Sequence, residues 1–90
     1  MAGTVEFRWN DWNRENATKH GCAIDEIESV VRRGGRGFPR FIGDGKFLVC
    51  GRGIGDRMIE VIYIRDPAPA VTIYVIHAMP LTLRRRRGRK

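Results

Sequence analysis

Three strand-like segments in the second half of the chain constrain its fold most strongly. They cover residues 46–52, 57–65 and 70–78, are rich in Val, Ile and Tyr, and are separated by the short connections GIGD and DPAPA. β-Branched and aromatic residues favour extended structure, and short connections join antiparallel neighbours, so we expect an antiparallel meander. The expected core residues of the last two segments are Ile59, Val61, Val71, Ile73 and Val75.

The first half of the chain predicts one strand and two helices. Residues 4–9 alternate between apolar and polar side chains, as in a half-buried strand. A helix should follow, with Asn10 or Asp11 as its N-cap and Gly21 at its end. Over residues 24–33, apolar side chains recur at helical spacing and acids fill the first turn, which predicts an amphipathic helix.

The order of these elements predicts an α+β fold. Residues 34–40, GGRGFPR, break regular structure and are expected to form a loop. A chain of 90 residues makes one domain, which we place at residues 1–83, followed by a basic C-terminal tail at residues 84–90. We expect a small antiparallel sheet, with the N-terminal strand and the three-stranded meander, and both helices on one face.

Positive charge gathers at the C-terminal end. Six of the last seven residues are basic, and without them the chain carries 11 Lys and Arg against 10 Asp and Glu. Guanidinium groups match phosphate oxygens and their summed field attracts polyanions, so nucleic acid is the leading partner. A solvated terminus is the alternative interpretation. The residues expected to dock RNA are Arg84, Arg85, Arg86 and Arg87.

The sequence gives no sign of a membrane segment or a cofactor. No stretch approaches the roughly 20 apolar residues of a spanning helix, and the opening residues lack the apolar core of a signal peptide, so we expect a cytoplasmic protein without a membrane partner. Cys22 and Cys50 lack the spacing of a metal site. The glycines of residues 51–55 join two strands and do not open a helix, so they do not indicate a dinucleotide site.

Several short motifs resemble those of the BrnT toxins, in the same order along the chain. The sequence F-R-W-N at residues 7–10 is similar to that family's F-x-W-D, and K-H-G at residues 19–21 matches its K-H-G before an acidic helix. Gly51-Arg52, Arg57 before the apolar strand with Tyr63, and V-I-H-A before the arginine-rich end resemble its G-R, G-R-L and I-S-A-R segments.

The resemblance implies a fold and a function. BrnT toxins belong to the RelE superfamily of small bacterial ribonucleases, which cut RNA without a metal and are neutralised by a co-expressed antitoxin. It therefore implies a RelE-like fold, a hydrolase that acts on RNA, with or without the ribosome, and a cognate antitoxin as protein partner. No cofactor is implied.

Metal-free RNA cleavage requires a base for the 2′-hydroxyl proton, an acid for the leaving 5′-oxygen and cations for the phosphate. His77 is the candidate for proton transfer because an ordinary imidazole titrates near pH 6.5. Arg52 and Arg57 flank the GIGD turn and are expected to face one phosphate. Lys19 and His20 are expected to contact RNA.

Each of these residues also has a structural interpretation. His77 can be a hydrogen-bonded histidine at a strand end, His20 can belong to the turn that ends the first helix, and the arginines can be solvated hairpin residues. Two other functions remain open for the whole chain. One is a non-catalytic basic RNA-binding module, such as a decayed toxin, and the other is a protein whose cationic surface mainly binds an acidic antitoxin.

Overall fold

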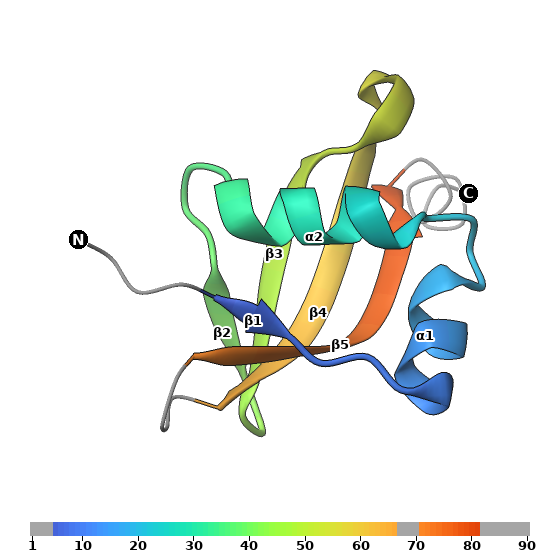
Figure 1. The fold of residues 1–90 in the computed structure, drawn as a ribbon. Helices are drawn as coiled ribbons and strands as arrows, with labels where there is room; N and C mark the ends of the chain where they lie inside the picture. Colours follow the sequence, from blue (N-terminus) through green and yellow to red (C-terminus); the bar gives the residue numbers. More distant parts are fainter. Residues whose placement is uncertain (1–4, 67–70, 82–90) are drawn as a thin grey trace, which may run out of the picture.

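A five-stranded mixed sheet is the centre of the computed structural model, which describes residues 5–66 and 71–81. The strands lie in the order β1-β5-β4-β3-β2, and two α-helices pack against them (Figure 1). The elements follow one another along the chain as β1 (Glu6–Phe7), α1 (Asp11–Thr18), α2 (Ile24–Arg33), β2 (Arg40–Gly43), β3 (Lys46–Arg52), the 3-10 turn η1 (Ile54–Asp56), β4 (Met58–Asp66) and β5 (Thr72–Pro80).

The predicted meander is confirmed. Strands β3, β4 and β5 pair antiparallel, and β3 has the predicted bounds, while β4 and β5 begin one and two residues later than predicted. The register pairs Val49 with Val61 and Val61 with Ala78, so three buried side chains lie in one row on one face. A β-bulge between Ile62 and Tyr63 shifts the pairing with β5, which moves His77 opposite Ile62.

The sheet is not wholly antiparallel, and that part of the prediction is wrong. Strand β1 pairs in parallel with β5, with Glu6 opposite Thr72 and Phe7 opposite Ile73. The backbone N–H of Arg8 extends this contact by donating to the carbonyl of Ile73 over 2.9 Å. A strand that joins the far edge of a meander can run in either direction, because the intervening helices and strands are long enough to return the chain either way.

The sequence interpretation also missed β2, whose first residue, Arg40, falls within the predicted loop. Its link to β3 is the two-residue loop Asp44-Gly45, flanked by the pair Gly43 and Lys46. Both loop residues have positive φ, 54° and 72°, which is the geometry of a tight hairpin turn. Asp-Gly is a strong hairpin signal, so this strand was readable from the sequence.

Both helices lie where the sequence places them. The Asn10 side chain caps α1 by accepting from the Asn13 N–H over 3.0 Å, and Gly21, with φ 92°, follows its end. Helix α2 has the predicted bounds and packs across β3 and β4, while α1 packs beside β5 (Figure 1). No helix in residues 5–66 and 71–81 has the length and apolar character that crossing a membrane requires.

The core lies between α2 and the sheet. Four of the five predicted core residues are buried, and Val71 is partly buried against them. Cys22 is also buried, and its burial, together with the charge of Glu26, outweighs the opposing effect of Arg57 and raises the pKa of its thiol to about 11. The Cys22 side chain is therefore a neutral core residue at physiological pH.

Candidate active site

A histidine and a glutamate meet on the face of the sheet that points away from α2. Side chains alternate along a strand, so His77 projects opposite to the buried Ala78, and Glu60 projects opposite to the buried Ile59 and Val61. The His77 Nε2 and the Glu60 Oε2 lie 3.0 Å apart. The His77 side chain is 27% exposed and that of Glu60 is 8% exposed. The His77 imidazole thus contacts a nearly buried carboxylate through Nε2 and stays accessible to solvent.

His20 joins this pair from the other end of the chain. It follows α1, and its ring meets that of His77 edge to face, with centroids 5.9 Å apart and an interplanar angle of 65°. Lys19 precedes it, is exposed, and donates from Nζ to the Asn16 side chain over 3.3 Å. Two predicted residues from distant segments, His20 and His77, are therefore brought together. We refer to His20, His77 and Glu60 as the histidine cluster.

The carboxylate of Glu60 determines what His77 can do chemically. An ionised carboxylate only accepts hydrogen bonds, so it selects the imidazole form that carries its proton on Nε2. The Nδ1 atom then keeps its lone pair and can accept a proton. This is the arrangement by which a carboxylate orients a histidine that acts as general base.

The sequence interpretation missed Glu60. A lone acid within the apolar run M-I-E-V-I-Y is a signal in itself, because carboxylates are rarely buried without a partner. Its partner could not be identified from the sequence, since the contact depends on the β4–β5 register and its bulge.

Arg57 is engaged in a structural network. Its Nη2 donates to Glu26 Oε1 over 3.1 Å and to the Gly21 carbonyl over 2.8 Å, and its Nε donates to Glu26 Oε2 over 3.2 Å. The Glu26 side chain is 1% exposed and also accepts from the N–H groups of Ala23 and Ile54. A methyl group on Gly53 would collide with this carboxylate, so the GIGD turn needs a glycine there.

The hydrogen bonds around Glu26 predict a dependence of stability on pH. Burial alone raises the pKa of Glu26, but the hydrogen bonds from Arg57, Ala23 and Ile54 outweigh it and hold that pKa below the ordinary value of 4.5. As the pH falls, Glu26 therefore takes up a proton in the unfolded chain before it does so in the folded chain. The stabilisation that ionised Glu26 gives to the folded state is present above its ordinary pKa and is lost as the pH falls through its lower pKa in the folded state.

We expect the free energy of unfolding, measured by urea titration, to fall from about pH 7 to about pH 3.5, and to fall less in Glu26→Gln than in wild type. The variant removes the titrating group and leaves the other carboxylates as an internal control. An equal fall in both proteins would show that Glu26 does not carry this effect.

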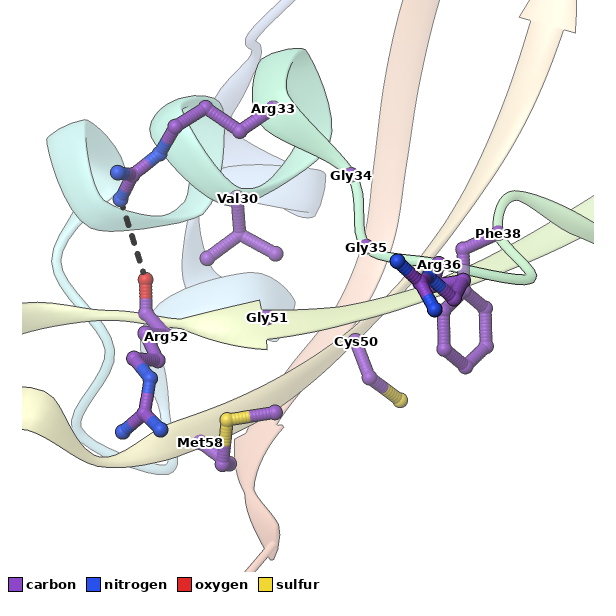
Figure 2. Close-up of a pocket in the computed structure, with 10 residues that line it drawn as sticks. All are labelled: Val30, Arg33, Gly34, Gly35, Arg36, Phe38, Cys50, Gly51, Arg52 and Met58. Carbon is purple, nitrogen blue, oxygen red and sulfur yellow. Dashed lines mark hydrogen bonds between the residues drawn. The ribbon is translucent and has the colours of Figure 1, made fainter.

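Arg52 has a different ion-pair partner from Arg57 and lies away from the histidine cluster. It forms an exposed ion pair with Asp56, whose Oδ1 lies 2.9 Å from Nη1 (Figure 2 shows Arg52). Arg52 is the register partner of Met58 in β4, and His77 is the register partner of Ile62 in the same strand. Met58 and Ile62 are four residues apart, which corresponds to about 13 Å along a strand. The two predicted arginines therefore have separate carboxylate partners, and within residues 5–66 and 71–81 neither forms a hydrogen bond or ion pair with a histidine.

The predicted RNA-docking residues Arg84, Arg85, Arg86 and Arg87, and the tail at 84–90 that holds them, lie outside the described residues. Within residues 5–66 and 71–81, no three His, Cys, Asp or Glu side chains are grouped so as to hold a metal ion. Comparisons of the chain with protein families, with curated proteins and with solved structures give no match.

Proposed function

We propose that the protein is an endoribonuclease that cleaves RNA without a metal, through attack of the 2′-hydroxyl on the neighbouring phosphate, with the histidine cluster as its active site. The observation that carries this proposal is the 3.0 Å contact of His77 with Glu60 beside a second imidazole 5.9 Å away. Two imidazoles and an orienting carboxylate supply both proton transfers that this reaction needs.

The roles follow from the hydrogen bonds. His77, oriented by Glu60, takes the 2′-hydroxyl proton at Nδ1. His20 in its protonated form gives a proton to the leaving 5′-oxygen, and Lys19, next to it in the chain, stabilises negative charge on the phosphate. The products are a 2′,3′-cyclic phosphate and a free 5′-hydroxyl, so no water enters the first step.

We further propose that the protein is a toxin of a type II toxin–antitoxin system, in line with the resemblance to BrnT toxins. The small α+β fold with a mixed sheet and two helices is compatible with a RelE-like arrangement that has both helices on one face. RNA, free or on the ribosome, and a cognate antitoxin are then its partners, in the cytoplasm of a bacterium.

Two observations favour a second candidate, an RNA-binding protein without catalysis. Arg57, a predicted catalytic cation, is held by Glu26 and the Gly21 carbonyl. Met79, which stands where the BrnT pattern has an arginine, is 5% exposed and lies opposite Glu60 in the sheet. A decayed toxin would keep the basic surface and lose the cations that stabilise a transition state.

Induction in a bacterial host separates the two candidates. We expect growth arrest with fragmentation of total RNA for the wild type. The double variant that carries both Arg52→Ala and His77→Ala should grow normally and keep its RNA intact. Normal growth and intact RNA with the wild type, at an expression level confirmed by immunoblot, would favour the binding protein. Arrest with intact RNA would point to binding as the toxic activity.

A further inference from the structure

A cavity of about 430 Å³ lies where β3 extends beyond its pairing with β2. It is bounded by the end of α2, the segment 34–38 and the last residues of β3, as Figure 2 shows. The volume falls within the range of small-molecule sites, which is roughly 300–1,000 Å³. None of the three residues of the histidine cluster lines it.

Apolar side chains and glycines form more than half of the lining of this cavity. Val30 from α2, Phe38 from the following segment and Met58 from β4 supply apolar side chains (Figure 2). Gly34, Gly35 and Gly51 line it as well, and the space beside Gly35 and Gly51 is filled by the Cys50 carbonyl and the Val30 side chain. A planar aromatic group fits such walls, because it gains from apolar contact and from stacking on the Phe38 ring.

The charged groups that line the cavity are three arginines, Arg33, Arg36 and Arg52, with no carboxylate among the lining residues. Arg33 donates to the Arg52 carbonyl over 3.5 Å, and Arg52 pairs with Asp56. Arg36, at the end of the cavity near Phe38 in Figure 2, makes no ion pair or side-chain hydrogen bond within residues 5–66 and 71–81. Its guanidinium has all its donors available for an anion.

A neighbouring cavity of about 200 Å³ indicates which end an anion would occupy. It shares Arg33 and Arg52 with the first, but Asp25 and Glu26 line it too. These acids reduce the positive potential at the Arg33 and Arg52 end, whereas Arg36 lines only the larger cavity, which no acid lines.

We propose that the larger cavity binds a nucleoside monophosphate unit, with the base against Phe38 and the phosphate on Arg36. The unit is either a free nucleotide or one nucleotide of a strand. The binding does not depend on the ribonuclease activity proposed above.

The test uses the full chain labelled with ¹⁵N and titrated with AMP, which has no bond for a ribonuclease to cut. We expect the largest amide shifts at Gly34, Gly35 and Gly51. Arg36→Gln should weaken AMP binding about tenfold, since a hydrogen bond to a charged group is lost, while Arg14→Gln, an exposed arginine of α1, should leave it unchanged. Ribose 5-phosphate and adenosine should each bind about tenfold more weakly than AMP.

Three results would overturn the proposal: shifts spread over the basic surface without a maximum at these glycines, equal losses in Arg36→Gln and Arg14→Gln, or ribose 5-phosphate binding as tightly as AMP. Competition with hexadeoxyadenylate, which lacks the 2′-hydroxyl and cannot be cleaved by 2′-attack, then identifies the source. Displacement of AMP supports a nucleotide within a strand, and the absence of displacement supports a free nucleotide.

Discussion

The substitution His77→Gln is expected to lower the rate of RNA cleavage by about 10²–10⁴-fold, the usual contribution of a positioned general base. Glutamine keeps a side chain of similar length and can still donate to Glu60, but its amide cannot take up a proton near neutral pH. The folded state should survive because the His77 side chain is 27% exposed. Cleavage of a fluorescent RNA under single-turnover conditions measures the rate.

RNA affinity is the companion measurement for His77→Gln. We expect it to stay within a few-fold of wild type, because a single side chain contributes little to the total charge that holds RNA. Glu15→Gln, at an exposed position of α1, serves as the control and should cleave at the wild-type rate. If His77→Gln cleaves as fast as this control, His77 is not the base.

The substitution Glu26→Ala is expected to lower the free energy of unfolding by about 3 kcal/mol, the lower end of the range for breaking a buried ion pair. It removes the carboxylate that accepts from Arg57 and from two backbone N–H groups. We take the lower end because the Arg57 side chain is 36% exposed, so its released guanidinium can be hydrated. Small domains are stable by only about 5–15 kcal/mol, so the loss should be large in a urea titration.

Asp25→Ala is the matched control for Glu26→Ala. Asp25 is exposed and lies next to Glu26 in the first turn of α2, so its removal should cost about 0.3–1 kcal/mol through the helix dipole alone. Equal losses for the two variants would show that the Arg57–Glu26 network does not hold the turn to the helix.

The elements of the fold were largely readable from the sequence, because each has a local signal. Apolar spacing gives α2 its bounds, and the Asn10 cap and Gly21 mark the ends of the first helical segment. Strand β2 was missed although Asp44-Gly45 signals a hairpin. The parallel pairing of β1 with β5 has no local signal, since the direction of a distant strand depends on how the whole chain returns to the sheet edge.

The candidate site was predictable residue by residue but not as a group. His77 and His20 stand out because imidazoles titrate near neutral pH, yet 57 positions of chain separate them and only the packing of α1 beside β5 brings them together. The same limit applies to Arg57. Its charge suggested a phosphate ligand, but Glu26, 31 residues away, already satisfies it. Contacts across the fold decide whether a cation is available, and spacing along the chain does not reveal them.

The most direct test of the proposed chemistry is the structure of the RNA ends that the purified protein produces in the presence of EDTA. We predict fragments with 2′,3′-cyclic phosphate and 5′-hydroxyl ends from the wild type, and intact RNA from His77→Gln. Intact RNA with the wild type, or 3′-hydroxyl and 5′-phosphate ends, would contradict attack by the 2′-hydroxyl at the histidine cluster.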